Sequence, residues 1–418
     1  MKIGNFTAEE LVNRFGSPIY VYDETKIREN YKKFYKAFSK NYKKVLVCYA
    51  YKANSNLAIC RILAREGAGA DVVSAGELYI SLLAGVPPEK IVFNGNNKTE
   101  EEIKMAIDTD ILMINVDSLH ELDLLQKIAS RYEKSIDIAF RINPDVSPKT
   151  HPKISTGLRE SKFGVDIKEA VNAYEKALEA DYINPVGVHM HIGSQITEIE
   201  PFSESTSKIM SLCKDLSEKL DLPIEFVNLG GGLGIKYDEK QSVLSVDEYA
   251  NVLSSIVKEE SEEIGIDPTL ILEPGRFIVG SSGTLLTKAG SIKNNPSIGK
   301  IVALEAGMNL LLRPALYGSY HRISVVKNSN KKIKTTVVGP LCESGDLFAR
   351  ERGLPDIDSG DIIAIHDVGA YGFSMSNQYN AVPRCAEVLV MNENADLIRK
   401  RETLSDLIQK QIIPERLL

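Results

Sequence analysis

The sequence predicts an α/β fold, a (β/α)8 TIM barrel joined to a second, mostly antiparallel β domain. Three observations lead to this prediction. Strand-like and helical runs alternate strictly between Lys43 and Arg276, and eight of these runs are strand-like. After Arg276 the runs are short, strand-like and broken by Gly, Pro and Asn. Strict alternation is typical of a parallel sheet, and eight repeats fit a closed barrel. A doubly wound open sheet is the alternative, but it usually has fewer strands and a Gly-rich first turn.

The chain begins with an expected short helix, which Thr7 and Glu10 open as a capping box. Strand 19–22 follows and is expected to pair with the β domain. The barrel strands are expected at 45–51, 70–74, 91–94, 111–116, 136–142, 185–191, 224–229 and 270–273. Amphipathic helices are expected at 57–64, 99–107, 119–132, 168–180, 202–220 and 246–264, the first capped by Asn54 or Ser55.

The C-terminal part predicts strands at 284–289, 301–304, 334–338, 362–366 and 385–390, and a short helix at 403–412. We therefore expect a barrel over 26–281 and a β domain that comprises 1–25 and 282–418.

Composition and charge narrow the possible partners. The net charge of -7 argues against nucleic acid and against anionic membranes. No apolar run approaches the roughly 20 residues of a membrane helix, and the N-terminus lacks the apolar core of a signal peptide. The five cysteines are scattered without a C-x-x-C pair, which favours reduced thiols in a cytoplasmic protein.

Polar residues gather where the barrel strands end, which is where barrel enzymes carry their active sites. Lys52 ends the first strand, where partial burial would make its amine a Schiff-base nucleophile. Most lysines at strand ends are simply solvated, so a catalytic role for Lys52 depends on the residues at the other strand ends. These carry Asp71, Ser74, Asn94, Gly95, Asn96, Asn97, Arg141, Asn143, His191, Ser194, Gly230, Gly231, Gly232, Glu273, Gly275 and Arg276.

The loops after strands seven and eight predict a phosphate site. Gly230, Gly231 and Gly232 allow backbone N–H groups to approach an anion, and Gly275 and Arg276 add an amide and a positive charge. The alternative for the three glycines is a tight turn. Glu273 could pair with Arg276 or bind a protonated ring nitrogen.

His189 and His191 lie two residues apart on one strand and so share a face. A metal pair would need a third ligand, and none follows at suitable spacing, so we expect a wall of the site and no metal. The lysine, the phosphate cradle, the carboxylate and the flat imidazole together fit pyridoxal 5′-phosphate (PLP). In such a site the lysine links to the cofactor, and the carboxylate keeps the pyridine nitrogen protonated so that the ring accepts electrons.

The run YAYKAN at 49–54 resembles the PLP-lysine motif of the diaminopimelate decarboxylase family, in the alanine racemase-like, fold type III group of PLP enzymes. The resemblance runs almost end to end. It implies that His191 stacks on the cofactor ring and that Ser194 meets the phosphate, within HIGSQ at 191–195. NLGGG at 228–232 and EPGR at 273–276 resemble the phosphate and pyridine-nitrogen sites. HPKISTG at 151–157, with KFG at 162–164, resembles a characteristic loop of the family.

Three motifs in the expected β domain strengthen the resemblance. RPALY at 313–317 implies that Arg313 and Tyr317 bind the distal carboxylate of the substrate. CESGD at 342–346 implies that Cys342 donates a proton and that Glu343 binds the distal amine. GAYG at 369–372 implies that Tyr371 contacts phosphate and substrate, and Arg276 is a further candidate substrate contact. A lone cysteine is normally a packing residue, so the role of Cys342 depends on the resemblance. Ala75 stands where the family frequently has glycine.

The resemblance implies PLP-dependent decarboxylation of meso-2,6-diaminopimelate to L-lysine and CO2, the last step of lysine biosynthesis. It also implies that the barrel binds PLP and that the β domain supplies substrate and dimer contacts, in a homodimer in which the Cys342 loop completes the site of the second subunit. A decarboxylase of ornithine or arginine is one alternative, although such cationic substrates would need an acid where Arg313 stands. Alanine racemase is another, but its small substrate needs no carboxylate clamp. A non-catalytic regulator with this fold is the third.

Overall fold

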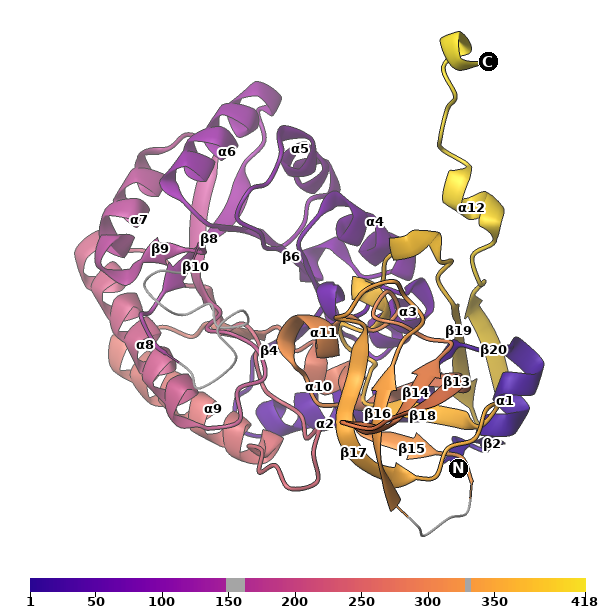
Figure 1. Cartoon of the computed structure of the whole chain (residues 1–418). Helices are drawn as coiled ribbons and strands as arrows, with labels where there is room; N and C mark the ends of the chain where they lie inside the picture. Colours follow the sequence, from indigo (N-terminus) through magenta and orange to yellow (C-terminus); the bar gives the residue numbers. More distant parts are fainter. Residues whose placement is uncertain (148–161, 328–331) are drawn as a thin grey trace. The chain divides into compact units, whose positions relative to one another are not determined.

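The structure is a computed structural model that describes residues 1–147, 162–327 and 332–418 (Figure 1). The chain divides into two compact units. The first, here called the barrel unit, comprises Arg28–Lys236 and Gln241–Ile278. The second, the β unit, comprises Met1–Ile27, Tyr237–Lys240 and Val279–Leu418. The segment Tyr237–Lys240 thus groups with the β unit although it lies inside the range expected for the barrel.

The barrel unit is built on eight parallel strands. Each pairs with the next along the chain, β10 pairs with β8, and β12 returns to pair with β4, which closes the ring. The two-residue strand β9 (Val165–Asp166) adds to β8. All eight lie within two residues of their predicted positions, and the predicted fold class is confirmed. The strands are β4 (Val45–Ala50), β5 (Gly69–Val72), β6 (Ile91–Phe93), β7 (Met113–Val116), β8 (Ile136–Asn143), β10 (Ile183–Met190), β11 (Phe226–Asn228) and β12 (Thr269–Leu272).

Burial explains why these runs are apolar over most of their length. Parallel barrel strands are covered on both faces, so their sequences are nearly continuous in apolar residues rather than alternating. Six strands each contribute one residue to a single buried cluster: Cys48, Val92, Met113, Ala139, Val186 and Ile271. Close packing of this kind holds the strand ends, and therefore the side chains that follow them, at fixed positions.

Helices surround the strands (Figure 1). They are α3 (Leu57–Arg65), α4 (Ala75–Ala84), α5 (Glu100–Thr109), α6 (Leu119–Tyr132), α7 (Ala170–Glu179), α8 (Glu200–Leu220) and α9 (Val246–Ile264), and α2 (Glu24–Ser39) precedes the first strand. The predicted cap of α3 is wrong, because Asn56 caps this helix and not Asn54 or Ser55. A single turn of 3-10 helix, Tyr51–Ala53, follows β4, and Asn54 then accepts the N–H of Asn56 before α3 begins.

The β unit carries a mostly antiparallel sheet in the order β17-β16-β14-β13-β3-β19-β20, with β18 pairing to β13 and β15. Strand β3 (Ile19–Asp23) lies between β13 and β19, as predicted for 19–22. Only the pairs β14–β16 and β3–β19 are parallel among the described strands of this sheet. The other strands are β13 (Gly283–Asn295), β14 (Gly299–Leu304), β15 (Ile323–Val325), β16 (Lys332–Val338), β17 (Leu347–Pro355), β18 (Ile362–His366), β19 (Ala386–Met391) and β20 (Asn394–Arg399).

Helices at the two ends of the chain belong to the β unit. The capping box of Thr7 and Glu10 opens α1 (Ala8–Phe15), as predicted, behind the small hairpin β1 (Lys2–Ile3) and β2 (Phe6–Thr7). The predicted C-terminal helix is shorter than expected, since α12 covers only Leu404–Ile408. Leu404 and Ile408 are exposed and Leu407 is only partly buried, and so short a helix without a buried face is not extended by packing. Among the described residues, no helix is both long enough and apolar enough to cross a membrane.

Candidate active site

Lys52 and Asp71 form the centre of the site in the barrel unit. Lys52 lies in the 3-10 turn that follows β4, and Asp71 lies on the neighbouring strand β5. The lysine Nζ is 2.8 Å from Oδ2 of Asp71. The Asp71 side chain is fully buried, whereas that of Lys52 keeps 35% of its surface exposed. The amine is therefore held by a charge-assisted hydrogen bond and remains accessible to a ligand.

A chain of buried amides connects this pair to Glu273. The Nδ2 atom of Asn94 donates to Oδ1 of Asp71 at 2.7 Å and to Oε1 of Glu273 at 2.9 Å. The same Glu273 oxygen accepts from Nδ2 of Asn228 at 2.8 Å. Asn115 donates to Oδ1 of Asn94 at 2.9 Å, which fixes the orientation of that amide. Residues that follow or end six barrel strands thus form one hydrogen-bonded network.

The pKa values of the two buried carboxylates of this network are shifted in opposite directions. Burial alone would raise the pKa of Glu273, but His189, Lys52 and the Asn94 amide lower it well below its ordinary value. The Nε2 atom of His189 is 3.4 Å from Oε2 of Glu273. Burial and the charge of Glu273 raise the pKa of Asp71 despite its contact with Lys52. Glu273 is therefore the carboxylate that stays ionised. Nearby, burial and the Asp71 carboxylate raise the pKa of Glu77 to about 7.

His191 follows the end of β10 and is partly buried. Its Nδ1 atom accepts the backbone N–H of Gly231 at 3.2 Å. Burial, together with the charges of Lys52 and Arg141, lowers the pKa of His191 well below its ordinary value. The ring is therefore neutral and presents a flat aromatic surface. The two histidines predicted to share a face meet different partners, and no group of three or more His, Cys, Asp or Glu gathers as a metal site within the part of the chain that the structure describes.

The loops after strands β10, β11 and β12 bring together the residues predicted to hold a phosphate. Arg276 is 5% exposed and donates to Oγ of Ser194 from Nη2 at 2.9 Å and from Nε at 3.3 Å. A Cβ atom at Gly231 would lie 2.2 Å from the carbonyl oxygen of Glu273, so only glycine fits there.

The glycine loop does not offer three unused amides. The N–H of Gly230 donates to Oδ1 of Asn228, and that of Gly231 donates to His191. The N–H groups of Gly232 and Gly275, by contrast, have no acceptor among the described residues. These two amides and the Arg276 guanidinium, with the Ser194 hydroxyl, are the groups that could hold the anion that the sequence predicts.

A second group of predicted residues lies in the β unit around Arg313, the first residue of α11 (Arg313–Tyr317). Arg313 is 4% exposed, and its Nη1 atom is 2.8 Å from Nε2 of His321. The guanidinium carbon lies 4.8 Å from the ring centroid of Tyr237. Tyr317, at the end of the same helix, is partly buried. A buried guanidinium held in this way is suited to recognise a carboxylate.

The loop with the predicted Cys342 and Glu343 is exposed, and both of these residues are exposed within it. The backbone N–H of Cys342 donates to Oδ1 of Asn380 at 2.7 Å. The buried carboxylate of Asp346 accepts the N–H of Leu341 at 2.8 Å and that of Met308 at 2.6 Å, which ties this loop to the segment leading to Arg313. Sequence reasoning assigned no role to Asp346.

Tyr371 is partly buried and has a φ of 56°, in the left-handed region that side chains other than glycine rarely occupy. Backbone conformations of this kind often occur where a side chain must be aimed at a ligand. The segment 151–157, part of the characteristic loop in the sequence, lies outside the described residues. Its companion Phe163 is described, and the Arg141 guanidinium carbon lies 4.3 Å from the Phe163 ring centroid.

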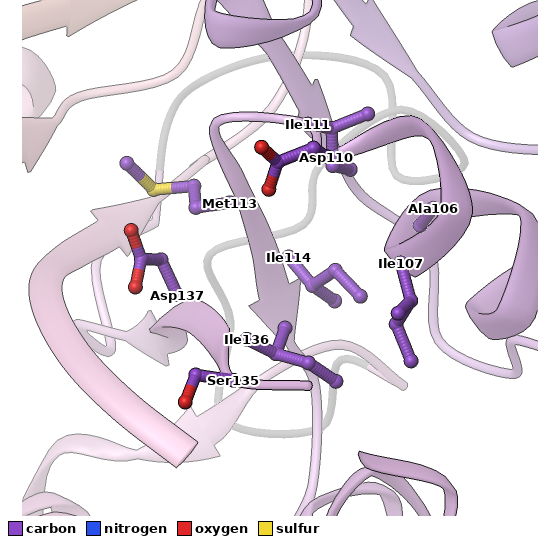
Figure 2. Close-up of a pocket in the computed structure, with 9 residues that line it drawn as sticks. All are labelled: Ala106, Ile107, Asp110, Ile111, Met113, Ile114, Ser135, Ile136 and Asp137. Carbon is purple, nitrogen blue, oxygen red and sulfur yellow. The ribbon is translucent and has the colours of Figure 1, made fainter. Parts of the chain in front are cut away.

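A separate pocket lies at the amino-terminal ends of β7 and β8 (Figure 2). Apolar residues from α5 and β7, with Asp110 and Asp137, line it. Because Lys52, Asp71 and Glu273 lie at the carboxyl-terminal ends of their strands, this pocket is at the opposite end of the barrel. None of the predicted catalytic, cofactor-binding or substrate-binding residues lines this pocket.

Comparisons with known proteins agree with this geometry. Residues 24–280 match the family model described as "Pyridoxal-dependent decarboxylase, pyridoxal binding domain". The diaminopimelate decarboxylase of Methanocaldococcus jannaschii is 48% identical over 100% of this chain and 96% of its own length. That of Archaeoglobus fulgidus is 47% identical over 98% of this chain and 96% of its own.

Solved structures give the same result. The crystal structure of the M. jannaschii enzyme is 49% identical, with a TM-score of 0.93 over 98% of this chain and 95% of that chain. The Helicobacter pylori enzyme complexed with L-lysine is 41% identical, with a TM-score of 0.91 over 96% of this chain and 98% of that chain.

A barrel of this type, with a lysine paired to one buried carboxylate and linked to a second that stays ionised, defines a PLP-dependent enzyme of fold type III. Within that class, the chain belongs to the diaminopimelate decarboxylase family.

The residues present fit the cofactor. Lys52 offers an accessible amine, and the ionised Glu273 suits a protonated ring nitrogen. The neutral His191 ring offers an aromatic face, and the anion site of Ser194, Gly232, Gly275 and Arg276 suits a phosphate. Sequence reasoning placed Asp71 and Asn94 at strand ends but missed their contacts with Lys52 and Glu273. The feature of the sequence that could have indicated these contacts is a polar residue at the end of an otherwise apolar strand.

Proposed function

We propose that this protein is a homodimeric, PLP-dependent enzyme that decarboxylates meso-2,6-diaminopimelate to L-lysine and CO2, the last step of lysine biosynthesis. The observation that carries the proposal is the buried network that joins Lys52, Asp71, Asn94 and Glu273. Full-length relatives named diaminopimelate decarboxylase support the substrate, as does the L-lysine bound to the H. pylori enzyme.

When bound, the cofactor provides an electron sink for the bonding electrons that the departing CO2 leaves at the α-carbon. Lys52 would hold the cofactor through its amine, which Asp71 keeps in position. Glu273 retains its negative charge and so would keep a proton on the ring nitrogen of the cofactor. The His191 ring would stack on the cofactor, and the groups that would hold the phosphate belong to Ser194, Gly230, Gly231, Gly232, Gly275, Arg276 and Tyr371.

The distal end of the substrate carries one carboxylate and one ammonium. Arg313 and Tyr317 bind the carboxylate, and Glu343 binds the ammonium, with Arg276 and Tyr371 as further contacts. A guanidinium can hold a carboxylate through two charge-assisted hydrogen bonds. Ornithine or arginine would place a cation beside Arg313, which is itself buried. That arrangement would cost roughly 2–5 kcal/mol by analogy with broken buried charge pairs.

Cys342 donates the proton that replaces CO2, from its Sγ atom, and does so in the site of the second subunit. The exposure of Cys342 and Glu343 supports this assignment, because a partner can reach them. The barrel over 26–281 then holds the cofactor, and the β domain of 1–25 and 282–418 provides substrate and dimer contacts. A cytoplasmic location belongs to the same proposal and is supported by five free cysteines.

The test is a product assay on the purified protein with PLP. Equal amounts of L-lysine and CO2 should form from meso-diaminopimelate. Ornithine, arginine and lysine, supplied at the same concentration, should give at least about a hundredfold less CO2, which corresponds to about 3 kcal/mol. Comparable CO2 release from ornithine or arginine would favour the alternative decarboxylase, and absence of product from all four would favour a non-catalytic role.

A further inference from the structure

We propose that His321 and Tyr237 are positioning residues that fix the direction and the plane of the Arg313 guanidinium, and thereby set the preference for a substrate with a distal carboxylate. The inference rests on the proposed function, because it takes Arg313 to be the residue that binds this carboxylate. Sequence reasoning assigned a role to neither residue.

The hydrogen bonds of His321 determine which of its ring nitrogens carries the proton. Nδ1 is 2.9 Å from the carbonyl oxygen of His366, which can only accept, so Nδ1 is the donor. Nε2 is 2.8 Å from Nη1 of Arg313, which can only donate, so Nε2 is the acceptor. His321 is therefore neutral, with its proton on Nδ1. Its side chain is held at both ends, and the residue is only 2% exposed.

Tyr237 fixes the plane of the guanidinium. It belongs to the short segment Tyr237–Lys240. This segment lies between two stretches of the barrel unit in the sequence, but it groups with the β unit. The Arg313 guanidinium carbon lies 4.8 Å from the Tyr237 ring centroid, within the range of a cation–π contact. The same ring meets that of His321 edge to face, with centroids 5.2 Å apart. The three side chains thus pack as one unit.

Together, the two contacts leave the charge of Arg313 intact while they remove its freedom of orientation. A neutral imidazole and an aromatic face cannot neutralise a guanidinium as a carboxylate would. Two-pronged binding of a carboxylate requires the guanidinium fork to be fixed in direction and in plane. The hydrogen bond from Nη1 fixes the direction, and the tyrosine ring fixes the plane. Loss of either should weaken ligands that have a distal carboxylate and spare those that lack one.

Two matched pairs of substitutions test this inference. In His321→Asn the side-chain amide can still donate to the His366 carbonyl, but it is too short to offer Arg313 an acceptor. In His321→Gln the amide oxygen reaches the position of Nε2 and can restore that acceptor. Tyr237→Leu removes the aromatic face, whereas Tyr237→Phe keeps it. The measurements are KM and kcat for meso-diaminopimelate and the inhibition constant of D-lysine. D-Lysine has the configuration of the reacting centre of the substrate but no distal carboxylate, whereas the product L-lysine retains the distal one.

We expect both variants to raise KM for meso-diaminopimelate by about tenfold or more, because His321→Asn loses a hydrogen bond to a charged group and Tyr237→Leu loses a desolvated cation–π contact. The inhibition constant of D-lysine and kcat should change by less than about threefold, because the lost interaction acts on binding of the distal group. His321→Gln should recover part of the loss, and Tyr237→Phe should raise KM less than Tyr237→Leu does.

Arg313→Ala, measured in parallel, distinguishes failure of this inference from failure of the proposed role of Arg313. If Arg313→Ala raises KM but His321→Asn and Tyr237→Leu do not, the inference is overturned and the proposed function stands. Equal changes for meso-diaminopimelate and D-lysine would also overturn it, since they would indicate a general disturbance of the fold. If Arg313→Ala itself leaves KM unchanged, the assignment of Arg313 to the distal carboxylate fails. Should His321→Asn not fold, the Tyr237 pair and His321→Gln still decide the outcome.

Discussion

Lys52 and Asp71 form an ion pair of 2.8 Å at the carboxyl end of the barrel, between a turn and the strand beside it. The second oxygen of Asp71 accepts from Asn94, and the same Asn94 nitrogen donates to Glu273. Asp71, which holds the Lys52 amine, and Glu273 are therefore coupled through the side-chain amide of Asn94. This arrangement explains how two buried carboxylates can lie close to one another, with the pKa of Asp71 raised and that of Glu273 lowered.

Asp71→Asn should impair the site although the side chain keeps its shape. The variant loses the charge that faces Lys52, and one of the two hydrogen bonds of the carboxylate lacks an acceptor. We expect kcat to fall by about 10- to 100-fold, in line with roughly 1.5–3 kcal/mol for a hydrogen bond to a charged group. The cofactor retained after dialysis, read from its visible absorbance, should fall as well. Asp137→Asn, at the opposite end of the barrel, is the control and should keep the wild-type kcat and cofactor content. An Asp71→Asn protein with wild-type kcat and cofactor content would refute the role of this pair.

Glu402 should contribute to stability in a pH-dependent manner. Burial alone would raise its pKa, but two hydrogen bonds from the Arg384 side chain, with Gln378 and the Arg384 backbone, lower the pKa of Glu402 to about 2. A carboxyl group whose pKa is lower in the folded state stabilises the fold above its unfolded pKa, near 4.5. That contribution disappears as the pH falls toward about 2.

Glu402→Gln should therefore lower the free energy of unfolding by roughly 2–3 kcal/mol at pH 7, and this difference should shrink between about pH 4.5 and pH 2. Urea unfolding at pH 7, 3.5 and 2 measures it, with the exposed Glu415→Gln as control. A difference that stays constant or grows in acid would contradict the assignment.

The shared site predicts complementation between inactive proteins. Lys52→Ala and Cys342→Ala should each be nearly inactive. When the two are unfolded together and refolded as a mixture, part of the molecules should pair as heterodimers with one intact site, and up to about a quarter of wild-type activity should return if pairing is random. Mixed protein no more active than the separate variants would indicate a site built within one chain.

The sequence predicts most of the fold because the barrel strands are apolar on both faces and most of their helices begin at a side-chain cap. Helix α2 and strand β17 were not predicted. The apolar residues of α2 include four aromatic side chains among many lysines, and β17 carries charged residues such as Arg350, Glu351 and Arg352. Neither has the clean periodicity on which the other predictions depend.

The site was predicted less completely than the fold. Strand ends locate Lys52, His191, Glu273 and Arg276, because the carboxyl ends of parallel strands meet at one face. The contact between Lys52 and Asp71 depends on the register between β4 and β5, which no local pattern specifies. The contact between Tyr237 and Arg313 could not be predicted for a related reason, since it joins segments far apart in the sequence.

The most direct test of the account is to identify the lysine that carries the cofactor. The protein with bound PLP is reduced with borohydride, digested and analysed by peptide mass spectrometry. Lys52 is the accessible amine of the network, whereas Lys98 is 2% exposed and held by Glu121 at 2.8 Å. We expect the cofactor mass to appear on the peptide that contains Lys52 and to be lost in Lys52→Ala. Attachment at Lys98 or at any other lysine of the wild-type protein would contradict it.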